Sequence, residues 1–166
     1  MSTFAVVNTY THSVTYVSDN IMRVLKDIIY QTGLNPRRLT RNWGVITRGI
    51  ETWLGTGHLN KVVLEVFNPS TNKLVGRWDI DIVYGESGDG NFWTDTEQIK
   101  YHILKAGVAP SNADYSIIAE NQPGYPNVDG WVSTNLRNTD GFTRHSFGMT
   151  ISHGGLGASA SGWHKK

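Results

Sequence analysis

The sequence contains no cysteine among its 166 residues, which excludes disulfide bonds, thiolate metal sites and a cysteine nucleophile. No apolar run approaches the roughly 18 residues of a membrane-spanning helix, and the first residues lack the pattern of a secretory signal. The formal net charge is only +1, so the charge excess of many nucleic-acid-binding proteins is missing. These absences favour a soluble, cytoplasmic protein of one domain over residues 1–166, without a membrane partner.

Motifs for cofactor or metal chemistry are also scarce. The sequence has no phosphate-binding loop with its lysine, no nucleophile elbow and no helical zinc pair. Asp79 and Asp81 alternate along a predicted strand, a spacing with which metal-dependent nucleotidyltransferases hold Mg²⁺. A Gly-Ser loop upstream is missing and Arg77 offers a neutralising partner, so a solvated strand face is the better interpretation. His145 and His153 form a weaker candidate metal pair. We expect no cofactor.

The first 33 residues predict a short arm followed by a long helix. Residues 1–10 are mildly apolar and are expected to form a small strand or a flexible arm. Over residues 12–32, apolar side chains recur at steps of three and four residues, the spacing of one helix face. Gly33 stands where a left-handed C-terminal cap belongs.

Two further helices are predicted over residues 36–55 and 94–107. The apolar spacing places Trp43 and Trp53 on the buried face of the second helix. Gly44 and Gly49 lie inside this helix and weaken it, so we expect the helix to be either broken or closely packed on a neighbour.

Alternating apolar and polar residues predict an antiparallel sheet. Residues 59–67 and 73–84 form a hairpin with one buried face, on which Trp78 lies, and one polar face. Residues 114–120 predict a short strand, and residues 143–151 predict a strand with which 156–163 is able to pair. The loop at 85–91 and the turn at 153–155 are rich in glycine. Helices beside such a sheet define the α+β class.

The last third of the chain, Asp129 to Trp163, combines many Gly and Ser residues with large apolar ones. A disordered tail would lack the apolar groups, because their burial is what offsets the entropy of ordering. A stable core element would contain fewer glycines. We therefore predict a segment that is ordered but only conditionally docked.

Five stretches carry a family resemblance in chain order: residues 9–17 (TYTHSVTYV), 48–59 (RGIETWLGTGHL), 64–67 (LEVF), 77–81 (RWDID) and 142–148 (FTRHSFG). Together they resemble the bacterial HORMA-domain proteins over essentially the whole chain. The short link after the first helix leaves no room for the extra hairpin of the eukaryotic HORMA proteins.

The resemblance implies a HORMA fold, an antiparallel sheet backed by three helices with a C-terminal safety-belt hairpin. It divides the chain into an N-terminal arm (1–10), a core (11–126) and a safety belt (127–166). The belt wraps a closure-motif peptide, which is held as an added strand on the core sheet. The implied peptide contacts are Tyr115, Ser116, Ile117, Ile118, Ala119, Trp131, Val132 and Leu136. The implied docking residues of the belt are Phe142, Phe147, Met149, Ile151 and Trp163.

The resemblance also implies partners and a role in CBASS anti-phage systems. There a peptide-bound HORMA protein binds and activates a CD-NTase, a cGAS/DncV-like nucleotidyltransferase that makes a cyclic nucleotide messenger. An AAA+ ATPase of the pachytene-checkpoint type pulls the HORMA protein apart and resets it. The arm residues it would engage are Ser2, Thr3, Phe4 and Ala5.

The function implied is therefore a non-enzymatic signalling switch. Two alternatives come from other classes of protein. One is a metal-dependent enzyme that uses Asp79 and Asp81. The other is a nucleic-acid-binding module, which the near-zero net charge disfavours.

Overall fold

The structure is a computed structural model that describes residues 3–84, 93–94, 96–153 and 156–165. Its helices are α1 (Thr3–Gln31), α2 (Arg37–Arg41), α3 (Trp43–Thr56) and α4 (Thr96–Ala106). Its strands are β1 (Leu59–Asn68), β2 (Lys73–Tyr84), β3 (Trp93–Thr94), β4 (Asp114–Asn121), β5 (Phe142–His153) and β6 (Leu156–Lys165). The expected loop at 85–91 and most of the turn at 153–155 lie outside the described residues.

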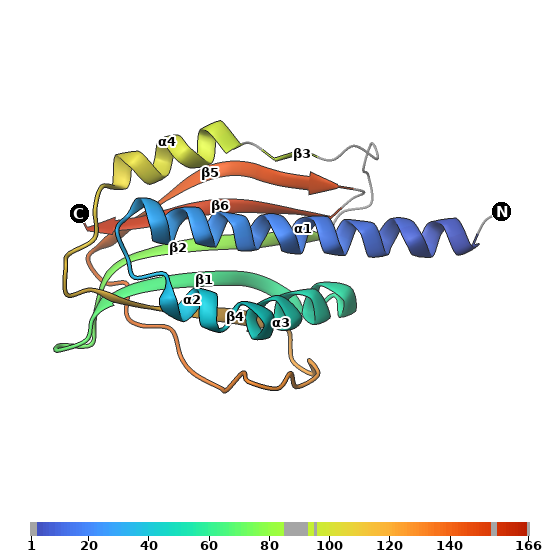
Figure 1. Ribbon diagram of the computed structural model, residues 1–166, viewed down its shortest axis with the longest axis horizontal. Helices are drawn as coiled ribbons and strands as arrows, with labels where there is room; N and C mark the ends of the chain where they lie inside the picture. The colour runs from blue at the N-terminus through green and yellow to red at the C-terminus, as the bar shows by residue number, and fades with distance from the viewer. Residues whose placement is uncertain (1–2, 85–92, 95, 154–155, 166) are drawn as a thin grey trace.

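The strands form one antiparallel sheet in the order β3-β5-β6-β2-β1-β4. The predicted hairpin is β1 and β2, and the C-terminal hairpin is β5 and β6 (Figure 1). The C-terminal hairpin, called the belt hairpin below, pairs through β6 with β2. Among the described strands, β4 pairs with β1 alone and is therefore an edge of the sheet. The predicted α+β architecture is confirmed.

One face of the sheet packs against the helices and forms the core. Register places Val62 opposite Ile80 on β2 and Ala119 on β4, so alternate residues of neighbouring strands share this face. α1 and α3 lie across it (Figure 1). The fully buried side chains they contribute include Ile21, Leu25, Ile28, Ile50 and Leu54.

The first helix begins at Thr3, well before the start that the sequence predicted. The expectation of a strand or a flexible arm is wrong for residues 3–10, which belong to α1. Residues 3–11 contain neither Gly nor Pro, so nothing there ends the helix upstream of the expected start. The first turns of α1 project beyond the sheet (Figure 1). Gly33 has a φ of 80° and confirms the predicted left-handed cap.

The second predicted helix is broken at Asn42 into α2 and α3. Trp53 and Trp78 are buried as expected, but Trp43 is 38% exposed, so its predicted burial is wrong. The break changes the helical phase just before Trp43 and turns that side chain out of the periodic face. The start predicted for the third helix also differs at Thr94, which belongs to the two-residue strand β3, and α4 covers Thr96–Ala106.

The second face of the hairpin is not the solvated face that the sequence predicted. The side chains of Glu65, Arg77 and Asp79 are buried there, at 0%, 5% and 1% exposure. Alternation reports which side chains share a face, but it does not show what covers that face. No helix within the described part of the chain is long and apolar enough to cross a membrane.

Candidate functional site

The outer edge of β4 offers unpaired backbone groups. The carbonyl of Tyr115 accepts a hydrogen bond from Nη1 of Arg38 at 2.5 Å, and its N–H donates to Oδ1 of Asp114 at 2.7 Å. Both backbone groups of Tyr115 therefore point away from β1. Alternate residues of an antiparallel strand point the same way, so Ile117 and Ala119 also present an N–H and a C=O at this edge.

Tyr115 is a buried residue that connects β4 to the region of α2, and it is not available as an exposed peptide contact. Its hydroxyl donates to the carbonyl of Asn35 at 2.6 Å and accepts from the N–H of Leu39 at 3.2 Å. The side chain is 2% exposed, and this burial raises the pKa of the phenol. Tyr115 thereby attaches β4 to α2, and the free part of the edge is displaced toward Ile117 and Ala119.

Beside this edge runs the segment 127–141, called the strap below. A cavity of about 190 Å³ lies between β4 and the strap, lined by Trp53, Ile117, Ile118, Ala119, Asn121, Tyr125, Asn127, Val128, Trp131, Val132, Ser133 and Thr134. A neighbouring hollow of about 210 Å³ is lined by Arg38, Asn42, Val45, Ile46, Ile117, Gly130 and Trp131. The two share Ile117 and Trp131, and together they form what we call the edge groove.

The structure brings five of the eight predicted peptide contacts to the edge groove. They are Ile117, Ile118, Ala119, Trp131 and Val132. The side chain of Val132 is 86% exposed, an unusual position for an aliphatic group. Ser116 lies on β4 opposite Glu65, on the sheet face away from the helices. Leu136 lies away from the groove, in a separate hollow of about 660 Å³ that also includes Phe142.

Trp131 anchors the strap to α3. Its Nε1 donates to the carbonyl of Val45 at 2.9 Å, and its ring meets Trp53 edge-on with centroids 5.0 Å apart. The indole lies so close to Gly49 that a Cβ there would overlap it. Gly130, with a φ of 92°, lets the strap approach Val45 just before the indole. The sequence left open a break or a close neighbour for Gly44 and Gly49; the close neighbour occurs at Gly49 alone of the two, and it is Trp131.

Trp53 holds the segment that leads into the strap. Its Nε1 donates to the carbonyl of Pro126 at 2.8 Å, and Tyr125 packs edge-on with a centroid separation of 5.7 Å. Trp53 is thus both a core residue and the wall of the groove, a second role that its periodic spacing did not reveal.

Beyond the groove the strap crosses to the second sheet face and binds Glu65. The backbone N–H and Nη1 of Arg137 donate to the two carboxylate oxygens of Glu65, each at 2.6 Å. The guanidinium also lies 3.6 Å from the ring centroid of Phe67 and donates to Asn72. Arg137 was not among the residues predicted from the sequence; the lone carboxylate Glu65 inside an apolar strand was the available signal.

The predicted docking residues of the belt have different surroundings. Ile151 is fully buried in the core, and Trp163 packs under the guanidinium of Arg77 at 4.9 Å. Phe142 is half-buried and pairs in register with Lys165. The side chains of Phe147 and Met149 lie outside the described residues.

The two carboxylates of the enzyme alternative are already paired with cations. Nε and Nη2 of Arg77 donate to the two oxygens of Asp79 at 2.6 and 2.9 Å, and Nζ of Lys61 lies 3.6 Å away. Nη2 of Arg144 donates to Asp81 at 2.7 Å. A divalent cation would compete with these guanidinium groups. The described residues contain no cluster of three His, Asp or Glu side chains fit for a metal.

His145 and His153 do not form a pair, because they lie eight residues apart on the same strand, β5. The ring of His145 instead lies beside that of His164 on β6, with centroids 5.7 Å apart. Burial lowers the pKa of His164, and the charges of His145, Lys105 and His102 lower it further. Burial, Lys105 and His145 likewise lower the pKa of His102.

The fold is that of a HORMA domain: an antiparallel sheet with helices on one face, and a strap that leads into a C-terminal hairpin. The chain aligns over 92% of its length with 98% of a chain in the crystal structure of the mitotic checkpoint complex, at a TM-score of 0.72 and 10% identity. It matches 90% of HTP-2 bound to HTP-3 motif-6 with a TM-score of 0.71, and 90% of C. elegans HTP-2 bound to the HIM-3 closure motif with a TM-score of 0.68. In both, 92% of this chain is covered at 13% identity, so the likeness shows the fold alone.

The model of the family described as bacterial HORMA domain 2 matches residues 1–166, and the chain belongs to that family. No curated protein sequence matches the chain.

Proposed function

We propose that this chain is a non-enzymatic signalling switch that binds an extended closure-motif peptide as an added strand on β4. The observation that carries the proposal is the edge groove, which Ile117 and Ala119 line together with the strap. Within the described part of the chain, the outward backbone groups of these two residues have no hydrogen-bond partner. Main-chain hydrogen bonds to such an edge supply affinity, and neighbouring hollows select side chains. HTP-2, which shares the fold, is bound to a closure motif in its structure.

The strap gives the proposed site a cover and a means of release. An open strand edge tends to pair with other chains unless something covers it. Residues 128–139 include no strand or helix, so the strap is held by side-chain ties, chiefly those of Trp131 and Arg137. Release of these ties opens the groove without unfolding the sheet.

The belt hairpin is a poor target for a deletion test, because Ile151, Leu156 and Ala158 are part of the core. The sharper test is Ala119→Pro, which removes one outward N–H from an edge position where proline is tolerated. A peptide selected from a displayed random library should bind this variant about tenfold more weakly, as expected for a lost hydrogen bond. Ala119→Ser, which keeps the N–H, is the matched control. Equal affinity of both variants would contradict strand addition.

The partners of the switch are a further part of the proposal. Family membership supports a CD-NTase that the peptide-bound form activates in anti-phage defence, and a pachytene-checkpoint-type AAA+ ATPase that resets it. The first turns of α1, which project beyond the sheet, offer the ATPase an end to grip and include Thr3, Phe4 and Ala5; Ser2 precedes them.

Reconstitution tests these partners. Cyclic nucleotide synthesis by a bacterial CD-NTase that binds this chain should rise only when the chain and a selected peptide are both added. Removal of residues 1–10 should leave that activation intact and prevent its reversal by the ATPase and ATP. Activation without any peptide would contradict the switch. If the ATPase still reverses activation by the truncated chain, residues 1–10 are not the segment that it engages.

A further inference from the structure

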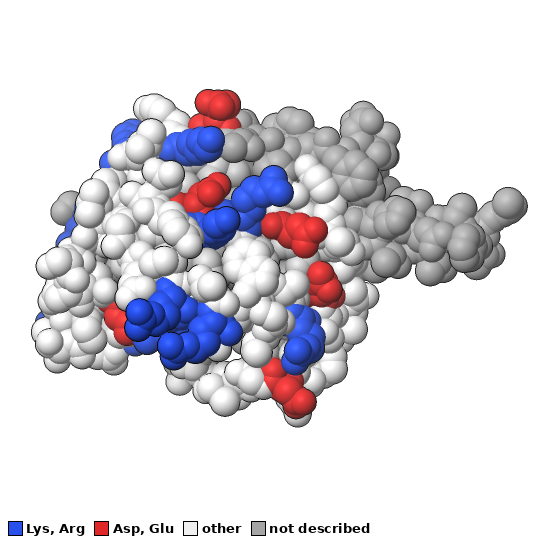
Figure 2. All heavy atoms as spheres, viewed as in Figure 1, with Lys and Arg blue, Asp and Glu red and all other residues white. Residues whose placement is uncertain are grey.

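The edge groove continues at the start of β4 into a hollow lined by arginines. This hollow, of about 290 Å³, is lined by Asn35, Arg37, Arg38, Arg41, Asn42, Ala113, Asp114 and Tyr115. Arg38 and Asn42 also line the edge groove, so the two spaces adjoin. We call it the arginine hollow. In Figure 2, Lys and Arg side chains gather on the surface over α2, where this hollow lies.

The charges of the arginine hollow are not balanced. Arg38 is engaged, because its Nη2 pairs with Asp114 at 3.0 Å and its Nη1 binds the carbonyl of Tyr115. Among the described residues, the guanidinium groups of Arg37 and Arg41 have no hydrogen-bond or ion-pair partner, and both residues are exposed. Asp114 is the only carboxylate in the lining. Two guanidinium groups therefore remain available to an acidic ligand.

A strand added to β4 leads directly into this hollow. Arg38 occupies the outward carbonyl of Tyr115, so pairing with the peptide ends near Ile117. A strand advances about 3.3 Å per residue, which brings the next two to four peptide residues past Tyr115 and alongside α2. Arginine binds carboxylates through paired N–H donors, a geometry that lysine does not reproduce.

We propose that the peptide bound in the edge groove has an acidic end, and that Arg37 and Arg41 bind its Asp or Glu side chains. This inference rests on the proposed function and specifies its ligand. The acidic residues follow the paired segment if the peptide runs antiparallel to β4, and precede it if the peptide runs parallel. The apolar and aromatic groove that adjoins the hollow favours a peptide over a nucleic acid.

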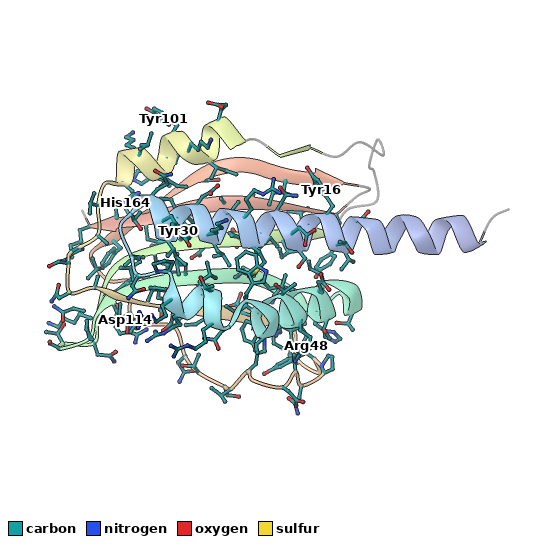
Figure 3. All side chains as sticks on the ribbon, in the orientation of Figure 1. Tyr16, Tyr30, Arg48, Tyr101, Asp114 and His164 are labelled. Carbon is teal, nitrogen blue, oxygen red and sulfur yellow. The ribbon has the colours of Figure 1, made fainter. Side chains whose placement is uncertain are left out.

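Selection from a displayed library tests the inference. Random peptides of about twelve residues, long enough to span groove and hollow at ~3.3 Å per residue, are selected on the wild type, on Arg37→Gln/Arg41→Gln and on Arg48→Gln. Arg48 is an exposed arginine of α3 that lies outside the hollow and far from Asp114 in Figure 3. The wild type and Arg48→Gln should enrich peptides with Asp or Glu near one end, and the double variant should lose that preference while keeping the apolar segment.

Two results overturn the inference and leave the proposed function standing: apolar consensus peptides without acidic residues on the wild type, or an unchanged acidic preference in the double variant. If no peptide is enriched on any form, both proposals fail.

Affinities of one selected peptide complete the test. The double variant should bind it about 3- to 20-fold more weakly, since each exposed ion pair contributes modestly. Replacing its acidic residues by Lys should weaken wild-type binding, and Arg37→Glu/Arg41→Glu should recover part of the loss. A single-stranded oligonucleotide is measured in parallel. If the double variant loses oligonucleotide binding but keeps full peptide affinity, the arginines serve a nucleic acid and the inference is wrong.

Discussion

Arg137 meets Glu65 at two points, through its backbone N–H and through Nη1, and the side chain of Glu65 is fully buried. Residues 72 positions apart are thereby joined across the second face of the sheet. Because the backbone N–H takes part, the contact fixes the path of the strap as well as the position of one side chain.

Arg137→Ala should lower the free energy of unfolding by about 3–5 kcal/mol, because it leaves a buried carboxylate without its counter-charge. Urea denaturation measures the change. Arg144→Ala is the control, since it removes a guanidinium from the more exposed pair with Asp81 and should cost about 0–1 kcal/mol. Glu65→Leu combined with Arg137→Met should recover most of the loss, because apolar replacement of a buried ion pair is often neutral. Similar costs for Arg137→Ala and Arg144→Ala would show that burial of Glu65 does not matter.

Replacing two glycines of α3 by alanine should change the stability of the protein in opposite directions. A Cβ added at Gly44 would meet nothing within 4 Å, so Gly44→Ala should stabilise the protein by about 0.5–1 kcal/mol through helix propensity. Gly49→Ala should instead displace the indole of Trp131 and loosen the strap, with lower stability and faster proteolysis of residues 127–141. Urea unfolding curves measure the stability change in both variants, and limited proteolysis measures the exposure of the strap. A stabilising Gly49→Ala would mean that Trp131 does not need its contact with α3.

Stability should fall as the pH is lowered from about 7.5 to 5.5. His102 and His164 have folded-state pKa values below the ordinary 6.5, so the unfolded chain binds more protons than the folded one once the pH approaches that value. Their contribution is present above about 6.5 and is lost as the pH drops toward the lowered values. The facing charges come from Lys105 on α4 and His145 on β5.

Unfolding midpoints measured across this range provide the check. His164→Gln should flatten the dependence, because it removes one of the two groups whose pKa the fold lowers. A wild-type profile without this acid-side slope would contradict the arrangement of charges between α4 and the belt hairpin.

Asp79 should act as a structural group and not as a metal ligand. Asp79→Ala leaves Arg77 buried without its partner, so about 3–5 kcal/mol of stability should be lost. Millimolar Mg²⁺ should leave the melting temperature of the wild type unchanged, because a cation must displace the guanidinium groups from both carboxylates. A Mg²⁺-dependent rise in melting temperature that disappears in Asp79→Ala would restore the enzyme alternative.

Sequence periodicity was sufficient for the regular elements. Repeats of three and four residues located the helices, and alternation located both hairpins and the edge strand β4. These patterns are local consequences of burying one face of a helix or strand. They failed where a local break or a missing stop signal decides the outcome, as at Trp43 beside the break and over residues 3–10.

The family resemblance indicated the strand that borders the groove, but not which of its residues are available to a peptide. It placed the peptide contacts on residues 115–119, 131, 132 and 136, yet Tyr115 is a buried link to α2 and Leu136 lies in a separate hollow. Which backbone groups of β4 face outward depends on its pairing with β1, and alternation alone does not give that phase.

Local pattern and composition thus specified the α+β elements, the absence of thiol chemistry and the mixture of glycine and apolar groups in the last third. Only the tertiary structure decided that Gly49 receives Trp131, that Arg137 neutralises Glu65, and that Arg37 and Arg41 border the free edge of β4. These contacts join residues far apart in the chain, or depend on the placement of α2 beside β4. Such contacts arise because folding buries charged groups and brings distant parts of the backbone close together. The spacing of apolar residues along the sequence contains no information on either effect.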